Sequence, residues 1–369
     1  MGRTTERRAP RLKDVAALAG VSHQTVSRVI NDHPNVRTET REIVRAAISQ
    51  LGYRPNTAAR SLVTRRSRRI GVLASELSQY GPANTLMGIE QAAKEAGYSV
   101  SVAALREVSR TRIWEAMNHL FDQPVDGIAV VVPHEDAFLA LNDMKLAVPV
   151  VTVGSPANKN FSGTLVDQRQ GARLAVQHLL QQGHRSIAHL SGPPGWSDSS
   201  ERREGWREAL RDAVLPDEHM FTGDWGAASG YTIGNEIARD QRISAVFVAN
   251  DQMALGVLRA FAEAGIRVPE DVSVVGFDDQ PESAYFTPPL TTVRQNFEEL
   301  GRKSVDSILQ ELDSGMPART TVITPAVQIR ASTAHHHAGT PTYRTHTPQT
   351  VDSLDKPLKI RSTADRNLG

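Results

Sequence analysis

The chain has 369 residues, of which 40% are hydrophobic, so a single small domain is excluded and two or three domains are expected. It has no cysteine, which rules out disulfides, thiolate metal sites and a cysteine nucleophile. No secretory h-region or long apolar run is present, so we expect a cytoplasmic protein without a membrane segment. The net charge of +1 hides an asymmetry, because residues 1–69 hold 15 Lys/Arg and 5 Asp/Glu, and such a basic head predicts a polyanionic partner.

Residues 1–10 are polar and rich in arginine, and we expect a disordered arm. A helix follows over 12–19, with apolar residues at helical spacing and Gly20 able to end it in the left-handed conformation. Ser22 is placed to cap a second helix over 23–30. Two short helices joined by so tight a turn predict a helix-turn-helix.

The second helix separates into two faces when it is projected at about 100° per residue. Its apolar face carries Val26, Val29 and Ile30, and its polar face carries His23, Gln24, Ser27 and Arg28. Glutamine and arginine have the bidentate geometry that reads adenine and guanine edges in the major groove. The pattern therefore indicates a double-stranded DNA partner for this helix.

A third helix is expected from Thr38 until Gly52 stops it, which completes a DNA-binding domain over 11–54. In the following linker, 55–69, a helix of only about two turns is marginal in water. We expect that helix to form only when something packs against it.

From Arg69 onward, short apolar strand-like runs alternate with amphipathic helical stretches, among them 85–96, 173–181, 201–213 and 253–264. The strand-like runs are RIGVLAS, YSVSVAAL, VDGIAVVVP, VPVVTVG, SIAHLSG, SAVFVAND and DVSVVGFDD. This alternation predicts an α/β core of doubly wound parallel sheets. The series restarts near Val166, so we expect two subdomains with a cleft at the carboxyl ends of their strands.

Beyond Ala334 the composition turns to His, Thr, Pro and Arg without periodicity, and we expect a disordered tail over 334–369. His335 to His337 offer an adventitious metal site as an alternative to a solvated tail.

Five segments in order, GVSHQTVSRVIN, YRPN, ANDQMALG, SVVGFDD and PPLTTVRQNF, resemble the lac repressor family of bacterial transcription regulators. The resemblance runs from about Leu12 to Thr333. It implies a helix-turn-helix head, a hinge helix, and a core over 70–333 resembling periplasmic sugar-binding proteins. The implied subdomains are 70–165 plus 295–324 and 166–294 plus 325–333, with crossings near Leu165, Arg294 and Thr324.

Carried over by position, the resemblance implies base-reading roles for His23, Gln24 and Arg28. It implies DNA backbone contacts for Ser22, Thr25, Ser27 and Asn31. Leu62 matches the leucine that the family inserts into the minor groove of a palindromic operator, where an apolar wedge bends the duplex. The alternative for Leu62 is a minor core position.

A sugar needs planar polar groups for its hydroxyls and an aromatic face for its C–H surface. At the family's effector positions the chain has Arg202, Asn250 and Asp278 of the first kind, and Trp225 and Phe297 of the second. Ser75 and Gln295 are weaker members of this effector-binding set. As alternatives, Asp278 and Asp251 would cap helices, and Trp225 would be a core or interface residue.

Three positions depart from the family's name-giving member: Gly154 replaces an aspartate, Asp198 replaces a serine, and Gln79 replaces a leucine. We include Asp198 in the effector-binding set. One carboxylate is removed and another is added, so hydrogen-bond acceptors for a sugar remain in the set. A galactoside is therefore the first candidate effector, and a different sugar or small metabolite is the alternative. The tail lacks leucine heptads, so a homodimer is expected.

The leading hypothesis is a sequence-specific repressor controlled by a small sugar, without cofactor or metal. A transport sugar-binding protein would need an export signal and no basic head. An enzyme would have Asp198, Asp278 and His189 available, but no phosphate loop, nucleophile elbow or metal-ligand spacing supports one. We expect no catalytic residues.

Overall fold

The computed structural model describes residues 10–30, 33–53, 66–154, 161–317 and 319–336. The chain divides into two compact units between Arg68 and Arg69. Asn31, Leu62 and the short helix expected after Asn56 lie outside the described residues. In the described ranges no helix is long and apolar enough to cross a membrane.

The first unit is a small bundle of three helices. They are α1 (Leu12–Ala19), α2 (His23–Ile30) and α3 (Thr38–Leu51). Val15, Val26 and Val44 are fully buried between them. Gly20 and Gly52 end α1 and α3 with φ of 64° and 61°, a conformation that costs glycine little because it has no Cβ. The predicted helical head is confirmed.

The second unit contains two six-stranded sheets, with strand orders β11-β5-β4-β3-β1-β2 and β12-β10-β9-β8-β6-β7. Neighbouring strands are parallel except β10 and β12. The first sheet comprises β1 (Arg69–Ser75), β2 (Ser99–Leu105), β3 (Gly127–Val131), β4 (Val150–Val153), β5 (Ser162–Val166) and β11 (Thr321–Ile323). The second comprises β6 (Ile187–Ser191), β7 (Met220–Thr222), β8 (Ala245–Val248), β9 (Ser273–Asp278), β10 (Thr291–Arg294) and β12 (Ala326–Gln328). The doubly wound α/β core is confirmed.

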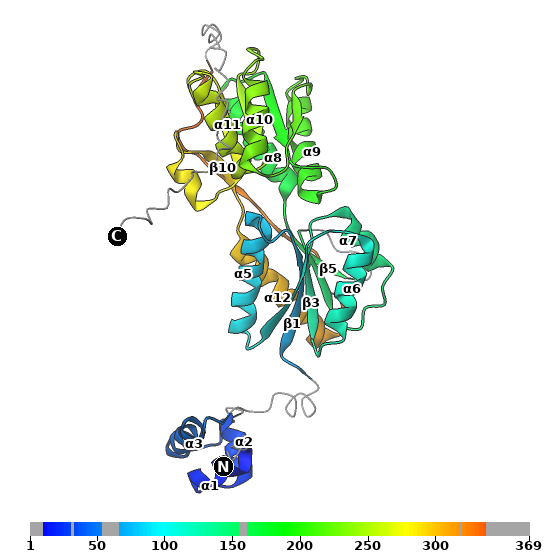
Figure 1. Ribbon diagram of the computed structural model, residues 1–369, viewed down its shortest axis with the longest axis vertical. Coiled ribbons are helices and arrows are strands. Elements are labelled where there is room, and N and C mark those ends of the chain that lie inside the picture. Colours follow the sequence, from blue (N-terminus) through cyan, green and yellow to red (C-terminus); the bar gives the residue numbers. More distant parts are fainter. Residues whose placement is uncertain (1–9, 31–32, 54–65, 155–160, 318, 337–369) are drawn as a thin grey trace, which may run out of the picture. The chain divides into compact units, whose positions relative to one another are not determined.

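Helices cover both faces of each sheet, which is why the strands are nearly continuous apolar runs (Figure 1). On the first sheet, α5 (Tyr80–Glu95) and α12 (Phe297–Ser314) cover one face, and α6 (Arg110–Phe121) and α7 (Glu135–Asn142) the other. On the second, α8 (Gln168–Gln181) and α9 (Ser197–Asp212) cover one face, and α10 (Ala227–Ile237) and α11 (Asp251–Glu263) the other.

The chain crosses between the two sheets three times. The crossings lie between β5 and α8, between β10 and α12, and between β11 and β12. These places fall within a few residues of Leu165, Arg294 and Thr324, where the family resemblance puts them.

Three helices begin earlier than their apolar periodicity indicates. α5 starts at Tyr80 instead of Thr85, α8 at Gln168 instead of Arg173, and α9 at Ser197 instead of Glu201. Their first turns carry no apolar stripe. These first turns supply Tyr80, Gln168 and Asp198 to the pocket described below.

The expected start of a disordered tail at Ala334 is wrong. The Ala334 amide donates to Ser273 Oγ at 3.1 Å, and the His336 amide donates to the Gln182 carbonyl at 2.7 Å. The His336 ring stacks on His184 at 5.2 Å between centroids. Backbone hydrogen bonds and this stacked pair therefore hold the chain on the second sheet's subdomain as far as His336, although its composition resembles that of a tail.

Candidate functional site

The head presents a polar face on α2. His23, Gln24 and Arg28 are exposed, whereas Val26 and Val29 are buried against the other helices. Ser22 Oγ accepts from the Thr25 amide at 3.1 Å and lies 2.8 Å from Thr25 Oγ1, which caps the helix. Ser27 is partly buried on the same helix. Three long polar side chains are thus held outward from a rigid helix.

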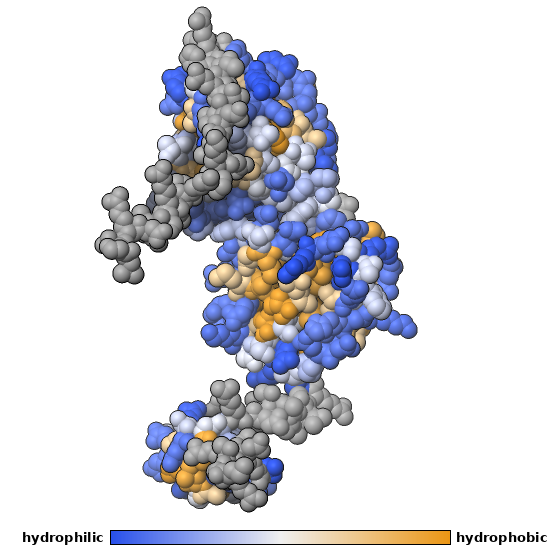
Figure 2. All heavy atoms as spheres, in the orientation of Figure 1, coloured by the Kyte–Doolittle hydropathy of each residue, from blue (hydrophilic) through white to orange (hydrophobic). Residues whose placement is uncertain are grey.

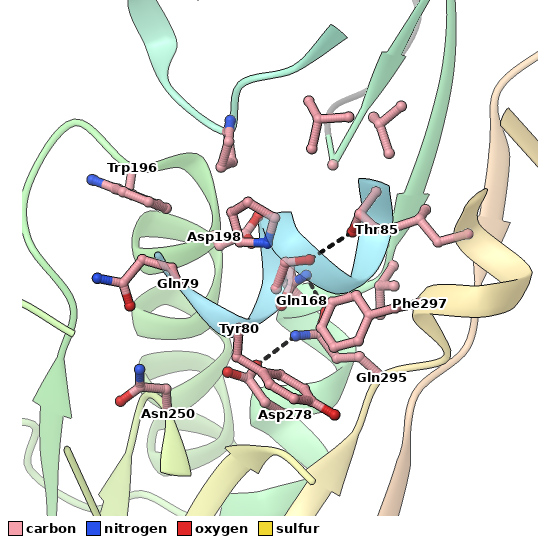
Figure 3. Close-up of a pocket in the computed structure, with 18 of the residues that line it drawn as sticks. Gln79, Tyr80, Thr85, Gln168, Trp196, Asp198, Asn250, Asp278, Gln295 and Phe297 are labelled. Atoms are coloured by element: carbon pink, nitrogen blue, oxygen red, sulfur yellow. Dashed lines mark hydrogen bonds between the residues drawn. The ribbon is translucent and has the colours of Figure 1, made fainter. Parts of the chain in front are cut away.

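The second unit contains a pocket at the carboxyl ends of strands from both sheets (Figure 3). It encloses about 630 Å³, open solvent included. Seven of the eight predicted effector residues line it: Asp198, Arg202, Trp225, Asn250, Asp278, Gln295 and Phe297. The eighth, Ser75, lines an adjoining cavity that shares Pro133 and Trp196 with the pocket.

A closed ring of polar contacts forms the floor of the pocket. Arg202 Nε donates to Gln168 Oε1 at 2.9 Å, and Gln168 Nε2 donates to Gln295 Oε1 at 2.8 Å. Gln295 Nε2 donates to Asp278 Oδ1 at 2.7 Å, and Arg202 Nη2 lies 3.5 Å from the same oxygen. All four residues are buried, and buried polar groups that satisfy one another fix their side chains in place.

Further contacts anchor the Arg202 guanidinium. Its Nη1 donates to the Ala249 carbonyl, and its Cζ lies 3.8 Å from the centre of the Phe277 ring, a cation–π contact. Its Nη2 is 3.8 Å from Asp198 Oδ2. One guanidinium therefore faces two carboxylates, which compensates for the cost of burying the charge.

Burial raises the pKa of Asp278 to about 6, while the Arg202 guanidinium acts in the opposite direction. Burial also raises the pKa of Asp198. Asp278 has φ of 105°, a strained conformation of the kind that accumulates at functional sites. It caps no helix in the described residues, because a 3-10 turn, Pro281–Tyr285, follows it.

Aromatic rings form the walls. The rings of Trp196 and Trp225 meet edge to face at 5.4 Å, and those of Tyr80 and Phe297 at 5.7 Å. Trp225 is only 6% exposed, and its Nε1 has no partner within the described residues. Trp225 both packs in the core and lines the pocket.

Asn250 combines a structural role with its place in the pocket. Its Oδ1 accepts from the Met253 amide at 2.9 Å and caps α11, and its Nδ2 donates to the Trp225 carbonyl at 3.0 Å. The alternative reading of Asp251 as the cap is therefore wrong. Asp251 instead accepts from Thr292 Oγ1 and Ser283 Oγ, each at 2.6 Å, and from a backbone amide.

Sequence reasoning missed Tyr80, Gln168 and Trp196 as pocket residues. Gln168 and Tyr80 are the first residues of α8 and α5, and Trp196 is the N-cap of α9. Correct helix starts would have found them, because helix N-termini after parallel strands lie at the ligand-binding edge. Gly154 and Gln79, the departures from the family pattern, also line the pocket.

Two family profiles match the chain. Residues 11–56 match bacterial regulatory proteins of the lacI family, and residues 176–333 match the periplasmic binding protein-like domain.

In the described residues no group of three or more histidine and acidic side chains is arranged to hold a metal ion.

The chain is similar to whole proteins as well. It is 36% identical over 325 residues to the lactose operon repressor of Escherichia coli (strain K12), covering 87% of this chain and 90% of that one. It is 39% identical over 311 residues to the HTH-type transcriptional regulator CelR of Thermobifida fusca, covering 80% and 90%. These relatives are transcription regulators, not enzymes.

Solved structures of transcription regulators are similar to this chain over most of its length. A lac repressor dimer bound to operator and the anti-inducer ONPF superposes with a TM-score of 0.79 at 35% identity, covering 89% of this chain and all of that one. A CelR–cellobiose complex superposes with a TM-score of 0.66 at 33% identity, covering 88% and 99%. Fold and pocket define a DNA-binding transcription regulator with a ligand-binding core. The chain belongs to the lacI family.

Proposed function

We propose that this protein is a repressor that binds a palindromic operator as a homodimer and loses operator affinity when a small sugar occupies the cleft. His23, Gln24 and Arg28 read bases, and Ser22, Thr25, Ser27 and Asn31 contact the DNA backbone. Leu62 enters the minor groove at the centre of the operator.

The observation that carries this proposal is the ring in the pocket floor. Gln168 follows the first crossing between the sheets and Gln295 stands at the second, and both bond to the groups that would meet a ligand. Through Gln168 and Gln295, a ligand that binds Arg202 or Asp278 therefore reaches two of the three connections between the subdomains. Such a ligand shifts an equilibrium by its differential affinity for the two arrangements.

An apolar surface supports the homodimer. Leu86, Met87, Val100 and Val102 line a shallow groove beside α5 and β2, and Met87 is 67% exposed. Figure 2 shows apolar side chains gathered on one face of this subdomain. A patch of this kind is typical of an association surface.

The aromatic walls and planar polar groups of the pocket suit a sugar, and a galactoside is the first candidate. A different sugar is the second candidate, because the pocket lining has no carboxylate at Gly154 and has one at Asp198. One relative was solved with cellobiose.

A gel shift with a palindromic operator tests the DNA function. We expect salt-sensitive binding that prefers the operator to scrambled DNA by at least about 1,000-fold. Equal affinity for scrambled DNA would refute the proposal. A thermal-shift screen against a panel of sugars then finds the effector, because a ligand of the native state raises the melting temperature.

A further inference from the structure

The charges of the pocket are unusual for a site that would bind an anion. Its lining in the described residues contains two carboxylates, Asp198 and Asp278, and one guanidinium, Arg202. The guanidinium already has both carboxylates within 3.8 Å. A phosphate or carboxylate on a ligand would therefore meet an excess of negative charge in a poorly solvated site, where repulsion is strong.

The adjoining cavity likewise has more acidic side chains than arginines. It is lined by the acidic residues Glu76 and Glu107 and by one arginine, Arg106, together with His134. The cavity shares Pro133 and Trp196 with the pocket, so a longer ligand would extend into it. An anionic group on such an extension would again meet more carboxylates than guanidinium groups.

Two buried polar atoms in the pocket lining have no partner within the described residues. They are Asp198 Oδ1, an acceptor, and Trp225 Nε1, a donor. An unpaired buried polar group costs free energy that a ligand recovers by pairing with it. A hydroxyl group donates and accepts, whereas an ionised phosphate or carboxylate offers acceptors to a carboxylate that needs a donor.

We propose that Asp198 determines the charge class of the effector: the pocket takes an uncharged, hydroxyl-rich ligand that donates to Asp198 and accepts from Trp225, and rejects phosphorylated and acidic sugars. This inference deepens the proposed function and rests on the effector site proposed there.

The test is isothermal titration of the full chain, without DNA, against matched sugars. The probes are methyl β-galactoside, lactose and cellobiose, each paired with an anionic counterpart that has the same rings: methyl β-galactoside 6-phosphate and methyl β-galacturonide for the first, lactose 6′-phosphate for the second, and cellobiose 6′-phosphate for the third. We expect an uncharged member to bind and its anionic counterparts to bind at least about tenfold more weakly, as for a lost charge-assisted hydrogen bond. Binding of a phosphorylated or acidic sugar as tightly as its neutral counterpart would overturn the proposal.

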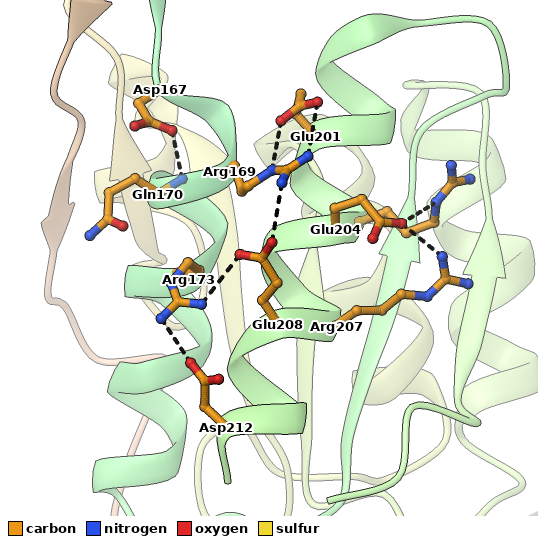
Figure 4. A network of polar contacts seen from close by, with 10 residues as sticks. Asp167, Arg169, Gln170, Arg173, Glu201, Glu204, Arg207, Glu208 and Asp212 are labelled. Atoms are coloured by element: carbon orange, nitrogen blue, oxygen red, sulfur yellow. Dashed lines mark hydrogen bonds and ion pairs between the residues drawn. The ribbon is translucent and has the colours of Figure 1, made fainter. Parts of the chain in front are cut away.

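The variant Asp198→Asn tests whether the Asp198 carboxylate causes the preference for neutral over anionic sugars. It should weaken binding of the neutral sugar about tenfold and reduce the preference for neutral over anionic sugar, since it removes a carboxylate from the pocket. An unchanged preference would contradict the role of Asp198. The matched control is Glu201→Gln on the same helix, because Glu201 pairs with Arg169 on the outer side of α8 and α9 and does not line the pocket (Figure 4).

Ligand-free melting temperatures of both variants show whether they fold. Operator binding by the ligand-free wild-type chain is measured on the same preparation. A failure of operator binding counts against the proposed function, whereas a failure of charge discrimination counts against this inference alone.

Discussion

Gln168 and Gln295 are joined side chain to side chain, Nε2 to Oε1 at 2.8 Å, although 127 residues separate them in the chain. Gln168 begins α8 after the first crossing between the sheets, and Gln295 lies between β10 and α12 at the second. The bond therefore connects two of the three segments that link the subdomains, directly beneath the ligand pocket.

Replacing Gln295 by methionine should uncouple the pocket from the crossings. The variant Gln295→Met removes the bonds to Gln168 and Asp278 and leaves both buried groups short of a partner, which should lower the free energy of unfolding by about 1–3 kcal/mol. Urea denaturation measures this loss. The control Gln177→Met, at a partly exposed position of α8, should change stability by less than about 0.5 kcal/mol. Equal effects would contradict a special role for the ring.

Asp251 predicts a pH-dependent stability. Burial, and then the charge of Asp278, raises its pKa from 3.8 to about 7. Because the folded-state value is the higher one, the stability that this group contributes is complete below its unfolded pKa and is lost as the pH rises toward 7. The slope is at most about 1.4 kcal/mol per pH unit.

The comparison with Asp251→Asn isolates this group, since the variant cannot titrate there. The advantage of the wild type over Asp251→Asn in melting temperature should be larger at pH 5 than at pH 8. The exposed carboxylate Asp306 on α12 provides the control Asp306→Asn, for which no such trend is expected. A difference between wild type and Asp251→Asn that does not vary with pH would show that Asp251 does not titrate in this range.

Much of the fold was predictable because it depends on periodic apolar residues. The head helices and the strands β1, β3, β8 and β9 follow from their spacing alone. The helix starts at Tyr80, Gln168 and Ser197 were not predictable in this way, since their first turns face the cleft and carry no apolar stripe. Apolar periodicity predicts the helix turns that pack in a core, and it does not predict helix ends that line a pocket.

The pocket was predictable only in part. Arg202, Asn250 and Asp278 were chosen by resemblance, and the structure brings them together. The role of Gln168 depends on a contact with a residue far away in sequence, which no local pattern contains. The buried network around Asp251 depends on Ser283 and Thr292 in the same way.

Close packing of α5 on α12 depends on a pair of glycines. A Cβ on Gly301 would overlap the backbone of Gly88 and Ile89. Gly301→Ala should therefore force the helices apart and cost about 1–3 kcal/mol, although alanine favours helix. The control Gln310→Ala, at an exposed position of the same helix, should be nearly neutral. A stabilised Gly301→Ala variant in thermal unfolding would refute this packing account.

The polar face of α2 predicts a separation of specific from non-specific binding. Arg28→Ala should weaken operator binding by about 1–3 kcal/mol and relax specificity at one base pair, because a bidentate contact is lost. Leu62→Ala should likewise weaken operator binding and leave binding to unrelated DNA nearly unchanged, as expected for a wedge that acts only in the bent complex. Anisotropy titrations on both DNAs measure the two affinities. Equal losses on both would contradict these roles.

We propose that ligand in the cleft controls the affinity of the head for DNA. The most direct measurement is a fluorescence anisotropy titration of the full chain onto a palindromic operator, with and without a saturating amount of the sugar found by thermal shift. The sugar should weaken operator binding by about 5–150-fold, and the operator should weaken sugar binding by the same factor. Identical operator affinity with and without a sugar that is shown to be bound would contradict it.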